Sequence, residues 1–325
     1  SWLTKPSSNL VPAPPSIKFA LGENVKQSNW GERYRIRYPQ SRMGVETIIK
    51  DAFQRAKEYE ADLAAYRALG DRERERTVPP RRNLRLEALV EVLNSRMFIT
   101  CHSYVQSEIL MLMRLAEHFG FRVSTFTHIL EGYKVAPEMA AHGAAGGAFS
   151  DWWAYKFEVY DAIPQNTCLM QEAGVLVSVN SDSQRLQRLL NQDAAKSVQY
   201  CGMSPEEAWK MVTINPATQL KADQWVGSIK PGKDADFVIW NHNPLSVYAK
   251  AEQTWIEGQQ YFDLESDLAF RRAISEEKND LIQKVLREAK DNEKWKRYLR
   301  YRDMNQKGSN PKTVQSVSAG EGGAR

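Results

Sequence analysis

Three apolar stretches, each followed by a polar side chain, decide the fold of this chain: Arg96-Met97-Phe98-Ile99-Thr100-Cys101-His102, Phe121-Arg122-Val123-Ser124-Thr125-Phe126-Thr127-His128 and Val175-Leu176-Val177-Ser178-Val179-Asn180-Ser181-Asp182. Their β-branched and aromatic residues predict strands that end where loops begin. His102 and His128 are about one strand–helix unit of roughly 30 residues apart, and His128 and Asp182 about two. Because (β/α)8 barrels carry their chemistry at the C-terminal ends of the strands, we expect the three side chains to converge.

Two imidazoles and one carboxylate are a donor set that suits a borderline divalent ion such as zinc. The spacing therefore predicts a metal site at His102, His128 and Asp182. A single histidine at a strand end is usually a hydrogen-bonded structural residue, and it is the shared spacing, together with the motifs described below, that favours the metal interpretation for His102 and His128. His118, inside a predicted helix, and His242, in an Asn-His-Asn-Pro turn, are interpreted as structural.

The rest of the sequence predicts further strands and helices around these three strands. A helix is predicted at about residues 44–69. From Leu84 to Val212 strands alternate with helices, which predicts an α/β fold with a parallel sheet. These helices are expected at about residues 84–93, 105–119, 135–141, 166–173, 185–200 and 205–212. Turn-rich residues 227–233 and short strands at 235–240 and 253–259 predict a small β domain. Residues 263–303 carry many charges of both signs with apolar residues at helical spacing. This segment is expected to be a helix that packs along the body, in preference to one that binds a partner.

Composition narrows the function classes. Of 325 residues, 42% are apolar, and the formal net charge is only +4, so the charge balance does not predict a nucleic-acid partner. No run of apolar residues is long enough to span a membrane and no signal pattern is present, which leaves the cytoplasm, the periplasm and secretion open. The three widely spaced cysteines are expected to be reduced.

A family resemblance rests on a set of motifs in a fixed order: Ile17–Asn24, Cys101-His102-Ser103, Thr127–Lys134, Asn180-Ser181-Asp182-Ser183, Thr213–Ala217 and Gly227–Asp236. The set resembles the amidohydrolase superfamily, especially its imidazolonepropionase-like branch, over residues 17–263. The resemblance implies a TIM barrel whose fifth and sixth strands each supply a metal-binding His and whose eighth supplies an Asp. It also implies a β-sandwich built from segments that flank the barrel.

The same resemblance implies a fourth-strand ligand, for which two residues compete. Lys18 resembles the carbamylated lysines of urease and dihydroorotase, and a carbamate there would bridge two metals. Glu23 is the alternative, and Lys18 is favoured slightly. One or two divalent metals, Zn2+ foremost, are therefore expected.

The chain departs from the family in one respect. Such enzymes carry an H-x-H pair on the first barrel strand, and none of the five histidines here is spaced in that way. We therefore expect the C-terminal half of a barrel, about strands 4–8, whose N-terminal half lies on the same precursor or on a partner chain. The predicted organisation is a linker (1–16), the half-barrel (17–222), a β-sandwich segment (223–263), a charged helical extension (264–304) and a disordered tail (305–325).

Further side chains are candidates for substrate binding. Tyr133 and Lys134 directly follow His128, although Lys134 is equally well interpreted as a solvated residue. Asn24, Lys26 and Arg42 lie in a polar loop, for which solvation is slightly favoured over a substrate clamp. The aromatic residues Trp152, Trp153 and Tyr155 are expected to line a pocket or to pack in the core.

The resulting functional prediction is a metal-dependent hydrolase of a C–N bond in a small amide, cyclic amide or dipeptide-like substrate. Metal-activated water would attack the carbonyl, and Asp182 would move the proton to the leaving nitrogen. The alternative is a non-catalytic subunit that acts as a scaffold or binds another protein.

Overall fold

The computed structural model describes residues 12–27, 31–34, 38–150, 152 and 154–308. Contacts divide the chain into two compact units, residues 1–261 and residues 262–325, and each is described by itself.

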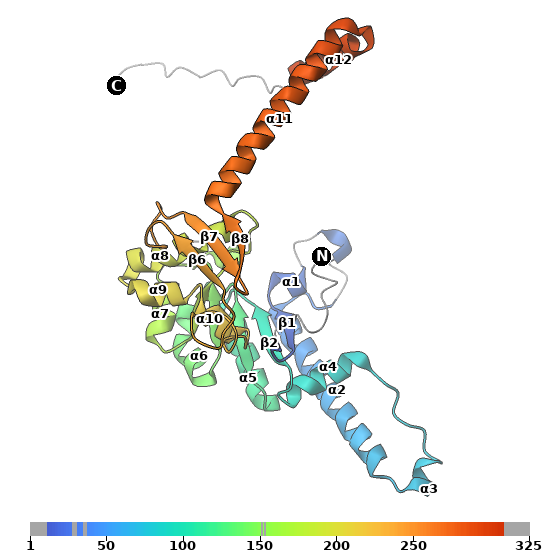
Figure 1. Ribbon diagram of the computed structural model, residues 1–325. Coiled ribbons are helices and arrows are strands. Elements are labelled where there is room, and N and C mark those ends of the chain that lie inside the picture. The colour runs from blue at the N-terminus through green and yellow to red at the C-terminus, as the bar shows by residue number, and fades with distance from the viewer. Residues whose placement is uncertain (1–11, 28–30, 35–37, 151, 153, 309–325) are drawn as a thin grey trace, which may run out of the picture. The chain divides into compact units, whose positions relative to one another are not determined.

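A parallel sheet of five strands forms the centre of the first unit (Figure 1). Its strands are adjacent in the order in which they occur along the chain: β1 (Ser16–Ala20), β2 (Phe98–His102), β3 (Val123–Thr127), β4 (Ala145–Ala148) and β5 (Val177–Val179). Helices connect the strands, so the predicted α/β fold with a parallel sheet is confirmed. Sequential parallel order is also the arrangement that a segment of a (β/α)8 barrel has.

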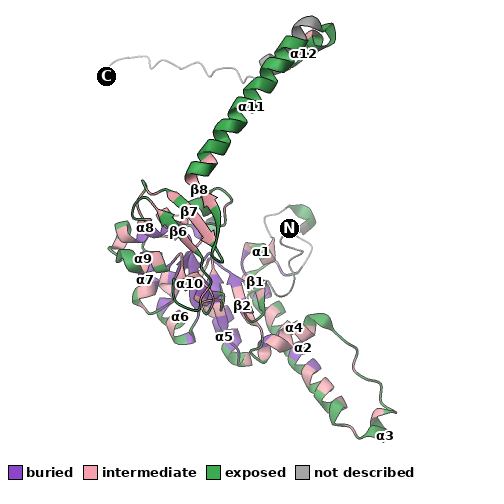
Figure 2. Cartoon of the chain, in the orientation of Figure 1, coloured by how far each residue is buried: buried purple, intermediate pink, exposed green. Residues whose placement is uncertain are grey.

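Seven helices that follow in this unit have the following bounds: α4 (Leu84–Leu93), α5 (Gln106–Phe119), α6 (Ala136–His142), α7 (Asn166–Glu172), α8 (Leu190–Cys201), α9 (Pro205–Lys210) and α10 (Ile214–Gln219). α5 shows why they form. Its apolar residues recur at helical spacing, and one side of the helix is buried (Figure 2). Gly120 ends the helix with a left-handed φ of 83°. The sequence predicted these helices to within a few residues, except α10.

A long, mainly helical connection separates β1 from β2. It contains α1 (Glu23–Lys26), the 3-10 turn η3 (Glu32–Tyr34), α2 (Arg42–Ala68) and α3 (Asp71–Arg74). Phe53 ties α2 to the core, because its ring lies 4.5 Å from that of Phe121 and 6.0 Å from that of Phe19 in β1. The helix predicted from Gly44 to Leu69 is therefore confirmed with a small shift.

A second, smaller sheet follows the parallel sheet along the chain. It orders β6 (Phe237–Trp240), β7 (Ala251–Ile256) and β8 (Gln259–Asp263), with β6 antiparallel to β7. The predicted small β segment is thus present, but its third strand was not expected. The predicted linker is one residue too long, because Ser16 already belongs to β1.

The second unit consists of α11 (Leu264–Asp291) and α12 (Glu293–Gly308). Asp263 caps α11 by accepting a hydrogen bond from the Ser266 backbone N–H at 2.9 Å. Both helices lie in the segment that the sequence predicts as a charged helical extension, and residues 305–308 belong to α12. The rest of the predicted tail lies outside the described residues. Among the described residues, no helix combines the length and apolar content that a bilayer crossing requires.

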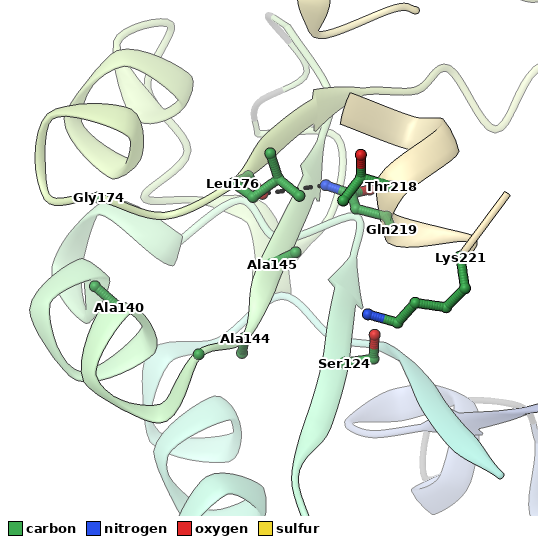
Figure 3. Close-up of a pocket in the computed structure, with 10 residues that line it drawn as sticks. Ser124, Ala140, Ala144, Ala145, Gly174, Leu176, Thr218, Gln219 and Lys221 are labelled. Carbon is green, nitrogen blue, oxygen red and sulfur yellow. Dashed lines mark hydrogen bonds between the residues drawn. The ribbon is translucent and has the colours of Figure 1, made fainter. Parts of the chain in front are cut away.

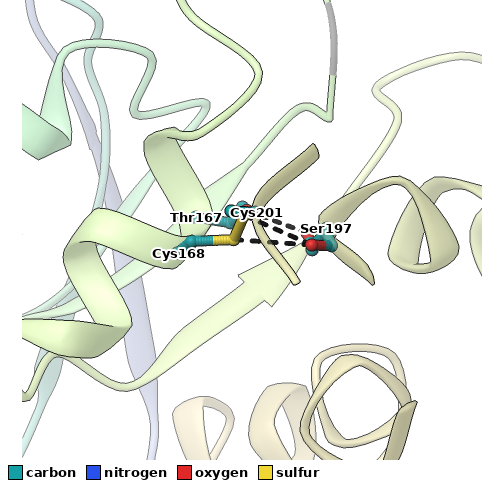
Figure 4. The surroundings of a disulfide bond; sticks show 4 residues. All are labelled: Thr167, Cys168, Ser197 and Cys201. Atoms are coloured by element: carbon teal, nitrogen blue, oxygen red, sulfur yellow. Dashed lines mark hydrogen bonds between the residues drawn. A yellow bond between two sulfur atoms is a disulfide. The ribbon is translucent and has the colours of Figure 1, made fainter. Parts of the chain in front are cut away.

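The cysteine prediction is wrong for two of the three thiols. Cys168 of α7 and Cys201 of α8 form a disulfide with their Cα atoms 6.5 Å apart (Figure 4). Packing of α7 against α8 brings together two residues that are 33 positions apart in the sequence, which spacing alone does not reveal. Cys101 is free and buried, and burial raises the pKa of its thiol.

Candidate active site

His102 and His128 meet at the C-terminal ends of neighbouring strands. His102 is the last residue of β2, and His128 directly follows β3 with a left-handed φ of 61°. Both are buried, and their ring centroids lie 5.0 Å apart with 65° between the planes. The predicted convergence of the two histidines is therefore present in the structure.

The ring nitrogens show what this histidine pair can bind. His128 Nδ1 lies 3.1 Å from Asn180 Oδ1, so the Nδ1 proton is donated to the amide oxygen and Nε2 keeps its lone pair. His102 Nε2 is buried and has no hydrogen-bond partner among the described residues. A buried polar atom without a partner costs roughly 1–3 kcal/mol, which a bound ligand would offset.

Burial lowers the pKa of both histidines and so favours their neutral form. Burial, followed by repulsion from His128 and Lys156, lowers the pKa of His102 to about 4. Burial also lowers the pKa of His128, while attraction from Asp182 opposes that shift. At neutral pH both imidazoles are therefore in the form that binds metal ions.

Asp182 lies in the loop after β5 with a left-handed φ of 42°. Its carboxylate is close enough to raise the pKa of both histidines, which places it at the same end of the sheet. No three potential ligands of the His, Cys, Asp and Glu types form a ready metal-binding group within the described part of the chain. The two imidazoles thus fit a metal ion, while Asp182 stands near them without completing the set.

The two candidate fourth-strand ligands differ in their surroundings. Lys18 of β1 is paired in register with Thr100, two residues before His102, and its charge lowers the pKa of both histidines. Glu23 lies at the start of α1, where its Oε2 is 3.2 Å from Lys26 Nζ. Proximity to the pair therefore favours Lys18.

The predicted substrate residues after His128 are held by other protein groups. Lys134 Nζ lies 2.5 Å from Asp161 Oδ2, and the Tyr133 hydroxyl donates to the Asp161 carbonyl at 2.9 Å. Asn166 accepts from the Tyr133 backbone N–H at 2.9 Å and donates to the Ile129 carbonyl at 2.7 Å. These contacts brace the loop that carries His128.

The predicted substrate residues Arg42 and Asn24 differ in their surroundings. Arg42 Nε lies 2.8 Å from Oε1 of Glu108, a buried residue at the start of α5 whose pKa burial raises. Asn24 is exposed on α1. Both residues belong to the segment that the sequence predicts as a polar loop.

Aromatic rings surround the histidine pair. Phe149 stacks on His128 with centroids 5.0 Å apart, and Trp152 stacks on Phe149 at 4.6 Å. Tyr155 meets Trp152 edge to face at 5.6 Å, and Tyr104 meets His102 in the same way at 4.7 Å. Tyr104, Phe149, Trp152 and Tyr155 are called the aromatic wall below; Trp153 lies outside the described residues.

Sequence reasoning did not single out Lys156 or Asn180 as candidate site residues, although Asn180 contacts His128 and Lys156 contacts Tyr104. Lys156 Nζ lies 4.0 Å above the centre of the Tyr104 ring and 3.5 Å from Glu158 Oε2. Its irregular loop has no periodic pattern that could have flagged it. Asn180 offered a signal, because it ends a predicted strand two residues before Asp182.

A hollow of about 160 Å³ lies at the opposite end of the sheet, near the N-terminal ends of β3, β4 and β5 (Figure 3). Gln219 spans its wall by donating to the carbonyls of Gly146 and Leu176 and by accepting from the Ser178 hydroxyl. Both the oxygen and the nitrogen of the Gln219 side-chain amide are therefore hydrogen-bonded within the fold. This arrangement is typical of a structural residue.

Comparison with known proteins gives a consistent result. The amidohydrolase family model matches residues 162–267. Amidohydrolase tasK of Hapsidospora irregularis is 30% identical over 259 residues, which cover 76% of this chain and 26% of that protein. Imidazolonepropionase of Thermoplasma volcanium is 30% identical over 122 residues, covering 37% of this chain and 30% of that protein.

Among solved structures, an amidohydrolase from Thermotoga maritima is similar with a TM-score of 0.67 and 28% identity. The similarity covers 76% of this chain and 62% of that one. This chain therefore spans about a quarter of the tasK relative's length and less than two thirds of the Thermotoga protein.

Proposed function

This chain belongs to the amidohydrolase superfamily, and from that premise we propose that it takes part in hydrolysing a C–N bond in a small amide, cyclic amide or dipeptide-like substrate. The observation that carries the proposal is the buried pair of neutral histidines at the strand ends, with His102 Nε2 lacking a partner among the described residues. Two such imidazoles are suited to hold a divalent ion.

The family generally uses divalent metals, and we propose that His102 and His128 would hold one, Zn2+ foremost, through their Nε2 atoms. Lys18 as a carbamate, or Glu23 in its place, would join them, with Asp182 as a further ligand or neighbour. The ion would supply Lewis acidity to a substrate carbonyl and to water. Asn180 would hold His128 in the tautomer that leaves Nε2 free for this purpose.

Asp182 and the aromatic wall would assist the reaction in two ways. Asp182 would accept the proton of the attacking water on its carboxylate and pass it to the departing nitrogen. The aromatic wall would exclude water, which strengthens electrostatic interactions within the site.

We further propose that a segment with an H-x-H pair, from the same precursor or from a partner chain, pairs against β1. Within the described residues β1 forms the edge of the five-stranded sheet, and an unpaired edge exposes backbone N–H and C=O groups that favour association. Such an interface would exceed about 2,000 Å², the range of obligate complexes.

Metal analysis tests the proposed function. His102→Ala and His128→Ala, each made in the protein with any co-purifying polypeptide, are expected to lose the metal and amide hydrolysis together, because few ligands remain. His118→Ala is the matched control, since His118 is exposed on α5. Full metal occupancy in both site variants would contradict the assignment, and a metal-free native protein would favour the scaffold alternative.

A further inference from the structure

The ammonium of Lys156 lies one aromatic ring away from the histidine pair. Its Nζ is 4.0 Å from the centre of the Tyr104 ring, whose centroid is 4.7 Å from that of His102. The side chain of Lys156 remains 35% exposed, so a ligand entering the site can reach it. Nothing in the proposed hydrolysis uses this positive charge.

A neighbouring acid fixes the lysine in place. Glu158 Oε2 lies 3.5 Å from Lys156 Nζ, longer than the roughly 2.7–2.9 Å of a charge-assisted hydrogen bond. The other carboxylate oxygen of Glu158 accepts from the Glu23 backbone N–H at 2.8 Å. Glu158 therefore orients the ammonium over Tyr104 and leaves N–H groups of Lys156 available for a ligand.

The positive charge of Lys156 disfavours additional positive charge on the two histidines. Lys156 contributes to the lowered pKa values of both His102 and His128, so its charge reaches both rings. A substrate anion beside the ammonium would be attracted to it, which a neutral amide would not be.

The covalent geometry of amino-acid amides fits that arrangement. In an N-acyl amino acid or a dipeptide, the carboxylate carbon is about 2.5 Å from the amide nitrogen, across one Cα. A scissile amide at the histidine pair therefore places its carboxylate within reach of a neighbouring cation.

From these contacts we propose that Lys156 binds the substrate's carboxylate, so that the substrates of this site are amides with a free carboxylate, such as dipeptides or N-acyl amino acids. This inference rests on the proposed function above, because it assigns the substrate class of the same site. Lys156 contributes binding and takes no part in proton transfer.

Equilibrium binding tests the inference without turnover. Calorimetry on the purified protein, with its metal and any co-purifying polypeptide, compares 3-phenylpropanoate with 3-phenylpropanamide, which differ only in the charged group. A hydrogen bond to a charged group is worth about 1.5–3 kcal/mol, so the carboxylate is expected to bind at least about tenfold more tightly.

Three variants complete the test. Lys156→Gln is expected to abolish the preference for the carboxylate, whereas Lys156→Arg keeps most of it. Lys221→Gln is the matched control, because Lys221 also lies over an aromatic ring, that of Phe98 at 6.0 Å, but at the other end of the sheet. Equal binding of the two probes to the wild type, no measurable binding of 3-phenylpropanoate, or a preference that survives in Lys156→Gln would overturn the inference.

Hydrolysis assays separate this inference from the proposed function. With N-acetylphenylalanine as substrate, Lys156→Gln is expected to raise KM about tenfold or more and to leave kcat nearly unchanged. Lys156-dependent binding without any hydrolysis would refute the proposed function alone. Hydrolysis of N-acetylphenylalanine and its carboxamide with equal efficiency in both wild type and Lys156→Gln would refute the inference alone.

Discussion

The two ends of the parallel sheet differ in how buried polar side chains are used. At the C-terminal ends of the strands, called the site end below, His102 Nε2 and Thr127 Oγ1 are buried without a hydrogen-bond partner among the described residues, and Thr125 Oγ1 in the middle of β3 is in the same state. At the N-terminal ends, Gln219 engages two backbone carbonyls and the Ser178 hydroxyl. Since an unsatisfied buried group costs stability, the free Nε2 of His102 is in keeping with a ligand site, whereas the bonded amide of Gln219 stabilises the fold.

Two residues at the site end have an unusual backbone conformation. His128 and Asp182 have positive φ values of 61° and 42°, a region that non-glycine residues rarely adopt. Lys221, beside the hollow at the opposite end, has a positive φ of 59° as well. Positive φ therefore does not by itself distinguish the two ends of the sheet.

The largest expected effect concerns Asp182. Asp182→Asn removes the proposed proton acceptor at the site end, so turnover of an amide substrate should fall by about 10²- to 10⁴-fold. Metal content, measured by plasma emission spectroscopy, should stay largely intact because the histidines remain. A rate close to that of the wild type would assign Asp182 a structural role.

A smaller effect is expected at Asn180, which orients His128. Asn180→Ala removes the acceptor for the Nδ1 proton, so metal affinity in a chelator competition assay should fall about 10- to 100-fold. Asn180→Asp keeps an acceptor in the same place and should retain most of the affinity. Equal affinities in all three proteins would contradict the role of Asn180.

The smallest effect, and one confined to stability, is expected at the opposite end. Gln219→Leu leaves two carbonyls and the Ser178 hydroxyl without their partner, so the free energy of unfolding should fall by about 1–3 kcal/mol. Denaturant titration measures this loss. Metal affinity should not change, and a parallel loss of metal would show that the two ends are not independent.

Local patterns were enough to predict the elements that carry the histidines. β2, β3 and β5 were expected from apolar runs, and the helix at Leu84–Leu93 was predicted with its observed bounds. His102 and His128 could be placed together because parallel strands end on the same side of a sheet, whatever packs around them.

Contacts between distant segments could not be predicted in this way. The disulfide between Cys168 and Cys201 depends on how α7 packs against α8, and the sequence suggested free thiols. The sequence also left open whether Trp152 and Tyr155 line a pocket or pack in the core. In the structure Trp152 stacks on Phe149, which stacks on His128, and Tyr155 meets Trp152 edge to face.

The sequence by itself determined the α/β pattern, the parallel strands and the histidines at their ends, because periodicity and strand direction are local properties that survive any detail of packing. Only the tertiary structure decided which atoms of those histidines stay free, that Asn180 holds His128, and that Lys156 stands over Tyr104. These features depend on side chains from loops that are far apart in the chain, and their positions follow from three-dimensional packing.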